Sequence, residues 1–233
     1  MKQVYDFLCR LKENNNREWF NANKEEYLQI REIFNGFVTS LIERMKVWDS
    51  RIRESAPTVS ECTYRIYRDT RFTKDKSPYK SHMAAYICRG GKKSPYAGYY
   101  FHLEPVAKGE EGNFLGESLL YAGLYRPESK IVKSLREEIY INGNSLLEAV
   151  AAAKGFVYNG EYLARVPYGY SDIKEEWSGL IRQKDFGLYL PLNSVRLFAG
   201  NDRLAEYVDR RFKSCRRYNE LINNAVDYAL EEC

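Results

Sequence analysis

Apolar side chains recur at helical spacing along residues 1–48. In the first predicted helix they share one face, which carries Val4, Phe7, Leu8 and Leu11. A longer apolar stripe over 19–45 predicts a second helix, because its members recur every three or four positions. Asn15, with Glu18 three residues later, is typical of a helix N-terminus, where the amide side chain caps free backbone N–H groups. The pattern therefore predicts two N-terminal helices.

From residue 62 onward the pattern changes to short runs rich in β-branched and aromatic residues. These runs are CTYRIYRDTRF (62–72), HMAAYICR (82–89), AGYYFHLEP (97–105) and a fourth inside NFLGESLLYAGLY (113–125). Runs of this kind, separated by turn residues, are typical of β-strands. Because no helical pattern separates them, they predict an antiparallel sheet rather than a parallel βαβ arrangement.

The second half of the chain returns to helical spacing after Pro127, a residue suited to opening a helix. VYNGEY (157–162) predicts a tight hairpin, since Asn-Gly takes the positive φ that its turn requires at both central positions. FGLYLPL (186–192) predicts a short strand at a sheet edge, because Pro191 has no N–H to donate. A final apolar stripe predicts one long helix from about residue 201.

No linker, repeat or low-complexity segment divides the 233 residues, which are enough to bury one sizeable core. We therefore expect a single α+β domain over residues 1–233, with an antiparallel sheet covered by the N- and C-terminal helices. The five cysteines include no C-x-x-C pair, which predicts neither a zinc ribbon nor a disulfide framework. The chain also lacks a secretory signal and an apolar run of about 18 residues, so we expect a cytoplasmic protein with no membrane partner.

Charge is concentrated in RIYRDTRFTKDKSPYK, residues 65–80. Six basic and two acidic residues give this segment a net charge of +4, equal to that of the whole chain. Arginine donates paired hydrogen bonds to phosphate or carboxylate, and aromatic rings stack on bases and sugars. A turn at residues 74–76, followed by Pro78, favours a bend that brings the cations toward one anion. The segment therefore predicts a site for a phosphorylated small molecule or a nucleotide.

The residues predicted to line this site share a positive charge or an aromatic ring: Arg65, Arg68, Arg71, Lys76, Tyr79, Lys80 and, on the following hairpin, Tyr99. In this hypothesis Asp69 orients the arginines, and Glu104 stands with Tyr99 on the opposite wall. A second hypothesis makes the protein an enzyme acting on the bound anion, with Glu104 or Asp69 as general base. The sequence leaves open whether a reaction follows binding.

Two further hypotheses change the partner or remove the ligand. The first is a nucleic-acid-binding module, to which the basic last helix would contribute, although a net charge of +4 is low for that class. The second is a structural or interaction protein. Asp69 lies two residues from Arg71, within reach of an ion pair, so the charges of the segment would form an internal arginine–carboxylate network.

Alternation in GYYFHLEP places Tyr100, His102 and Glu104 on one face of a strand. A histidine and a carboxylate two residues apart are candidates for metal ligands or for an acid/base pair. His82 is the only other histidine of the chain. A histidine-rich metal site is therefore not expected, and we predict no metal and no cofactor. Glu104 is expected to pair instead with an arginine of the first predicted strand, residues 62–72, across the sheet.

The chain resembles the family called domain of unknown function 2461. The resemblance rests on NNNREWFNANKEEY (14–27), RIYRDTRFTKDKSPYK (65–80), GYYFHLEP (98–105) and GLYRP (123–127), and it spans nearly the full length. It implies kinship and a shared fold, and it assigns no activity. The positions that match the family motif are Arg65, Arg68, Asp69, Arg71, Phe72, Lys76, Pro78, Tyr79 and Lys80, with Tyr99 and Glu104 on the following hairpin.

Overall fold

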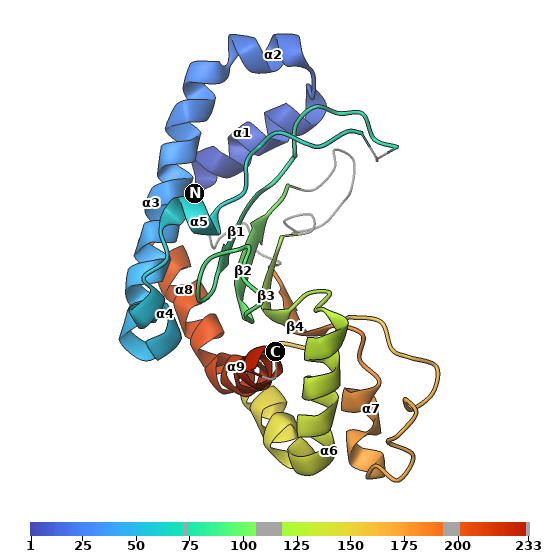
Figure 1. Cartoon of the computed structure of the whole chain (residues 1–233). Coiled ribbons are helices and arrows are strands. Elements are labelled where there is room, and N and C mark those ends of the chain that lie inside the picture. Colours follow the sequence, from blue (N-terminus) through green and yellow to red (C-terminus); the bar gives the residue numbers. More distant parts are fainter. Residues whose placement is uncertain (72–73, 106–117, 193–200, 232–233) are drawn as a thin grey trace.

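The computed structural model describes residues 1–71, 74–105, 118–192 and 201–231 (Figure 1). The helices that precede the sheet are α1 (Lys2–Glu13), α2 (Arg17–Ala22), α3 (Lys24–Trp48), α4 (Ser50–Ser55) and α5 (Val59–Cys62). The strands are β1 (Met83–Ile87), β2 (Gly98–Leu103), β3 (Leu119–Leu124) and β4 (Phe186–Pro191). The remaining helices are α6 (Ser129–Ala152), the 3₁₀-helix η1 (Glu175–Trp177), α7 (Ser178–Ile181), α8 (Asn201–Ser214) and α9 (Arg216–Glu231).

The strands form an antiparallel sheet in the order β1-β2-β3-β4, so each strand pairs with its neighbour in the sequence. This order confirms the antiparallel sheet that the runs of β-forming residues predicted. It also places β4 at an edge, as Pro191 indicated, because a proline inside the sheet would remove a ladder hydrogen bond. Only the first predicted strand is missing from the sheet within the described residues.

One face of the sheet packs against α3 and α8, which come from opposite ends of the chain (Figure 1). On this face the ring of Phe101 lies 4.8 Å from that of Phe37 in α3, and the ring of Tyr99 lies 5.4 Å from that of Phe212 in α8. The buried apolar side chains form one continuous core from α1 to α9. The predicted fold class, a single α+β domain, is confirmed. None of the helices within the described ranges has the length and apolar composition needed to cross a membrane.

In the first run predicted as a strand, residues 62–72, Cys62 belongs to α5, and the described residues after it form only isolated bridges. Residues 64–71 and 74–80 lie side by side in an irregular projection, joined by backbone hydrogen bonds, and we call these residues the basic arm (Figure 1). The cause lies in two aspartates. Asp69 accepts a hydrogen bond from the backbone N–H of Arg71, and Asp75 accepts one from that of Ser77. Such local side-chain bonds compete with a strand ladder.

VYNGEY (157–162) does not form the predicted hairpin, because neither Asn159 nor Gly160 takes positive φ. Val157 instead bridges Tyr189 of β4, with backbone hydrogen bonds of 2.9 and 2.7 Å in the two directions. The end of the segment bonds to the chain that precedes β4. Long-range partners therefore satisfy the backbone groups that a local turn would have paired.

Two helix boundaries also differ from the prediction. Asn16, rather than Asn15, caps α2 by accepting a 2.9 Å hydrogen bond from the backbone N–H of Trp19. Asn15 instead binds the backbone of Tyr79 in both directions and thereby holds the basic arm against the N-terminal helices. The predicted last helix is broken at Cys215, since α8 packs on α3 whereas α9 packs along α6.

Gly143→Ala is expected to destabilise the protein by about 1–3 kcal/mol, the usual cost of overpacking a core. A Cβ at Gly143 of α6 would lie 2.5 Å from the ring of Trp177, which is buried. Gly36→Ala is the matched control, because nothing lies within 4 Å of the added Cβ in the middle of α3. That variant is expected to gain about 0.5–1 kcal/mol from helix propensity. Chemical denaturation measures both, and equal effects would contradict the packing argument.

Candidate functional site

The face of the sheet opposite the core carries a row of tyrosines across all the strands. Tyr86 of β1 pairs with Tyr100 of β2, which pairs with Tyr121 of β3, which pairs with Tyr189 of β4. Alternation puts these side chains on one face, and the register aligns them. We call this surface the tyrosine face. It combines flat apolar rings with hydroxyl groups, a combination common in ligand sites.

Hydrogen bonds and packing hold these rings in place. The Oη of Tyr86 lies 2.8 Å from the carbonyl oxygen of Gly123. The hydroxyl of Tyr121 donates a 2.8 Å hydrogen bond to the carbonyl oxygen of Leu124. Tyr121 lies across Gly187, where a Cβ would come within 1.9 Å of its hydroxyl oxygen. Burial raises the pKa of both phenols well above the usual value, so they are neutral hydrogen-bonding groups at physiological pH.

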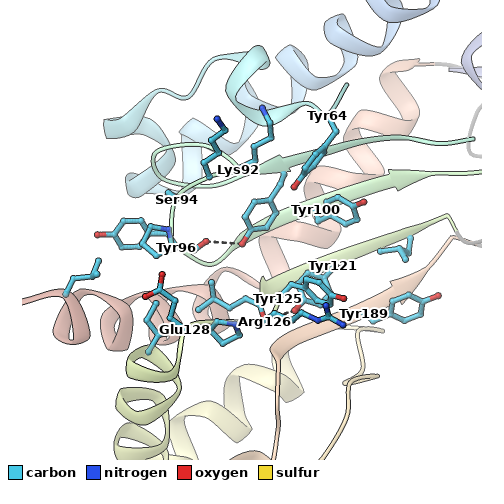
Figure 2. Close-up of a pocket in the computed structure, with 18 of the residues that line it drawn as sticks. Tyr64, Lys92, Ser94, Tyr96, Tyr100, Tyr121, Tyr125, Arg126, Glu128 and Tyr189 are labelled. Carbon is cyan, nitrogen blue, oxygen red and sulfur yellow. Dashed lines mark hydrogen bonds between the residues drawn. The ribbon is translucent and has the colours of Figure 1, made fainter. Parts of the chain in front are cut away.

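A pocket of about 870 Å³ lies over the tyrosine face (Figure 2). One wall is the β1–β2 loop, residues 92–96, and the other is the turn from β3 into α6, residues 124–131. Figure 2 shows Lys92, Ser94 and Tyr96 on the first wall, with Tyr125, Arg126 and Glu128 on the second. Tyr64 of the basic arm closes one side, and its ring meets that of Tyr100 edge to face at 6.2 Å.

Positive charge dominates the pocket. Its lining contains the cations Lys80, Lys92, Lys93, Arg126 and Lys130. Among the described lining residues, Glu128 is the only carboxylate. Lys80 and Lys92 both lie over the ring of Tyr64, at 5.5 and 5.9 Å from its centre. Burial lowers the pKa of Lys80, and the neighbouring arginines of the basic arm lower it further. An anion that binds beside Lys80 would relieve this repulsion.

Arg126 has an unusual backbone conformation for a residue with a side chain. Its φ is +49°, and its N–H donates a 2.8 Å hydrogen bond to Asp185, just before β4. The guanidinium lies 5.2 Å from the centre of the Tyr125 ring. A non-glycine residue with a left-handed backbone conformation costs free energy and persists only where the surrounding structure holds it. Such residues cluster at binding sites.

A cluster of two histidines and a carboxylate lies at one end of the tyrosine face. The Nδ1 of His102 is 2.8 Å from the hydroxyl of Tyr100, and its Nε2 is 3.1 Å from the Oε2 of Glu104. His82 stacks beside His102 with ring centres 4.4 Å apart, and its Nδ1 lies 3.8 Å from the same Glu104 oxygen. The predicted sharing of one face by Tyr100, His102 and Glu104 is confirmed.

The other oxygen of Glu104 has separate partners. Its Oε1 accepts a 2.7 Å hydrogen bond from Ser81 and lies 3.8 Å from the ammonium group of Lys12. The expected partner was an arginine of the first predicted strand, residues 62–72, and that expectation is wrong, because the basic arm turns away before it can add a strand beside β1. Burial lowers the pKa of His82 to about 4, helped by the adjacent His102, so His82 is neutral at pH 7.

Both aspartates of the basic arm are paired with arginines of the same arm. Arg71 binds Asp69 through its Nε at 3.0 Å and its Nη2 at 2.7 Å, and Arg68 binds Asp75. The Nζ of Lys76 donates to a backbone carbonyl of the arm over 2.9 Å. Bonds from Arg71 lower the pKa of Asp69 to about 2. The ion pair between Asp69 and Arg71 that the sequence indicated is present.

Of the residues predicted to bind the ligand, Lys80 lines the pocket. Tyr79 is buried and stacks on Phe20 at 3.9 Å, and Tyr99 is buried on the core face of β2. Arg65 is exposed on the arm. Phe72, which matched the family motif, lies outside the described residues.

Sequence reasoning missed most of the pocket. The signal for the tyrosine face was the presence of a tyrosine in each strand run, MAAYI, GYYFHL, LLYAGL and FGLYLP, but the register of the strands was needed to align them. The signal for Arg126 was its place in GLYRP (123–127), one of the stretches that carried the family resemblance. Charge density alone drew attention to the arm, where Arg68 and Arg71 already bind aspartates.

Comparison with known proteins gives one family. The model of the family described as "Conserved hypothetical protein (DUF2461)" matches residues 3–220, from α1 into the first turns of α9. The match includes the whole sheet, the basic arm and nearly all of the pocket lining. No curated protein and no solved structure is significantly similar to the chain.

Proposed function

The chain belongs to the DUF2461 family of conserved hypothetical proteins, and we propose that it binds a phosphorylated or otherwise anionic small molecule over the tyrosine face. The single observation that carries the proposal is the pocket itself. It combines a floor of aromatic rings with a rim of five cations and one carboxylate. Cations favour phosphate or carboxylate groups, and the faces and hydroxyls of tyrosine suit a sugar or a base.

The size of the pocket favours a small molecule over a nucleic acid. About 870 Å³ lies within the range of roughly 300–1,000 Å³ common for small-molecule sites. A nucleic acid would require a basic track that continues along the surface, with stacking platforms for successive bases. The basic arm offers less charge to such a track than its composition indicates, because Arg68 and Arg71 each bind an aspartate of the same arm.

A structural role for the arm is a second proposal, and it is compatible with the first. Its internal ion pairs, and the hold of Asn15 on the backbone of Tyr79, support an arm that keeps Lys80 at the pocket rather than one that grips a ligand along its length. Asp69 is weakly supported as a general base, because its pKa, lowered to about 2 by Arg71, makes it a poor proton acceptor.

A thermal-shift screen tests the binding proposal. The protein is heated with phosphate, sulfate, nucleotides, sugar phosphates and short oligonucleotides, each with and without Mg²⁺. A ligand at 100 times its dissociation constant adds about 2.7 kcal/mol of stability. For a chain of this size, the midpoint should rise by about 5–10 °C. We expect phosphorylated ligands with a ring to give the largest shift.

Arg71→Ala, on the exposed part of the arm, is the control, and it should retain the shift. If this variant lost the shift, the ligand would bind on the basic arm, and the proposal that it binds in the pocket over the tyrosine face would be wrong. If no ligand of the screen shifted the melting midpoint at millimolar concentration, the proposal of small-molecule binding would be wrong. A shift by oligonucleotides alone, with a steep dependence on salt, would replace the proposal with nucleic-acid binding.

A further inference from the structure

The cluster at the end of the tyrosine face has the composition of a metal site. From its geometry we propose that His82, His102 and Glu104 bind one divalent transition-metal ion. This proposal concerns residues that the anion site does not require, and it does not rest on the proposed function. It revises the expectation of no metal, which was based on the chain having only two histidines.

The pairing of β1 with β2 brings the three residues together. Ala84 pairs with His102, and Met83 with Leu103, so the continued register sets His82 opposite Glu104. His102 and Glu104 already share a face by alternation, and His82 lies on that same face. The small side chain of Ala84, directly opposite His102, leaves the space between the two imidazoles open.

The distances suit an ion after small side-chain adjustments. One ligand atom from each residue lies within 4.8 Å of the others. The Oε2 of Glu104 is 3.1 Å from the Nε2 of His102 and 3.8 Å from the Nδ1 of His82. Ligand atoms bound to one tetrahedral ion at about 2.0–2.2 Å stand about 3.4 Å apart. Rotation of the side chains within the cluster closes the difference.

The surrounding hydrogen bonds are those that orient metal ligands. The hydroxyl oxygen of Tyr100 can accept a hydrogen bond from the Nδ1–H of His102, and this tautomer directs the Nε2 lone pair toward the ion. Ser81 donates to the Oε1 of Glu104, which leaves Oε2, the oxygen nearest both histidines, for the metal. Lys12 also lies on the Oε1 side, 3.8 Å away, and so does not occupy the metal position.

The ligand set indicates which ions fit. Two imidazoles with one carboxylate suit zinc, iron(II), cobalt(II) and related ions, whereas magnesium and calcium prefer oxygen ligands. Three protein ligands leave at least one coordination position for water or another molecule. Since His82 also lines the pocket, this position lies beside the proposed ligand site.

Titration of tag-free protein with Co²⁺ tests the proposal, because the chain has only two histidines and any imidazole ligation must come from them. We expect one equivalent to bind and to produce visible d–d absorption bands. Equilibrium dialysis with Zn²⁺ should give the same stoichiometry. His82→Gln, His102→Gln and Glu104→Gln should each weaken binding by at least 10-fold, as should Tyr100→Phe through the orientation of His102.

Cys9→Ser is the control, because Cys9 is the partly exposed thiol among the described cysteines and it should contribute nothing. Circular dichroism checks that each variant is folded. If a histidine variant fails to fold, the imidazole ¹⁵N spectrum of the unmodified protein replaces it, and Zn²⁺ should shift signals of both histidines.

Several results would overturn the metal site. These are absence of stoichiometric binding at millimolar metal, binding that survives in His102→Gln, loss of binding in Cys9→Ser, or imidazole signals unmoved by Zn²⁺. A simple His–Glu hydrogen-bond network would then account for the cluster. Because the probe is the metal alone, such a failure leaves the anion screen unaffected.

Discussion

Phe101→Ala is expected to lower the free energy of unfolding by about 3–5 kcal/mol, among the largest effects of any single core truncation. Phe101 is fully buried at the centre of the covered face of the sheet. Its ring contacts Phe37 at 4.8 Å and Phe34 at 6.3 Å, which joins β2 to α3. Truncation would remove these contacts and leave a cavity between two layers that meet over many residues and cannot close it.

Urea denaturation monitored by circular dichroism measures this effect. Tyr168→Ala is the control, because this aromatic side chain is fully exposed and its loss should change stability by less than about 0.5 kcal/mol. If Phe101→Ala cost no more than the control, the layer of α3 would not be packed on β2 as described. The packing of Phe101 also affects the candidate site, because β2 carries Tyr100 and His102 on its opposite face.

Arg126→Gly is expected to weaken anion binding by about 10- to 150-fold while leaving the protein as stable as before. The substitution removes a hydrogen bond between the Arg126 guanidinium and the bound anion. A hydrogen bond to a charged group is worth about 1.5–3 kcal/mol, which corresponds to this loss of affinity. Stability should change by less than about 1 kcal/mol. Glycine relieves the strain of a φ of +49°, and this gain offsets the greater freedom that glycine has in the unfolded chain.

Isothermal titration with the best ligand of the screen measures the affinity. Arg126→Lys keeps a charge at the same backbone position, and it should recover part of the lost affinity although the paired hydrogen bonds of arginine are gone. Arg71→Ala, on the basic arm, should bind as the wild type does. Unchanged affinity in Arg126→Gly, combined with a loss in Arg71→Ala, would place the ligand on the arm instead of the tyrosine face.

Local sequence patterns determined most of the fold. The β-branched and aromatic residues of HMAAYICR and AGYYFHLEP predicted β1 and β2, and Pro191 predicted that β4 is an edge strand. Apolar stripes predicted the helical character of both ends of the chain. These predictions succeed because periodicity reports which side of an element is buried, and that property belongs to a few consecutive residues.

Local patterns failed where distant partners competed with them. The Asn-Gly pair at 159–160 has strong hairpin propensity, yet its flanks pair with β4 and the preceding chain, and no type I′ turn forms. The last helix breaks at Cys215 because its two halves pack on different helices. In the basic arm, Asp69 and Asp75 replaced a strand ladder with local hydrogen bonds, which composition alone did not reveal.

The candidate site shows the same division. The sequence determined that Tyr100, His102 and Glu104 occupy one face of their strand, and it determined where charge is dense. Only the tertiary structure decided that the tyrosines align, that His82 meets Glu104, and that Arg68 and Arg71 of the arm are paired with aspartates. Alternation is set by neighbours along the chain, whereas register is set by the side chains that the assembled sheet buries. A site built across strands therefore appears only when the strands are paired.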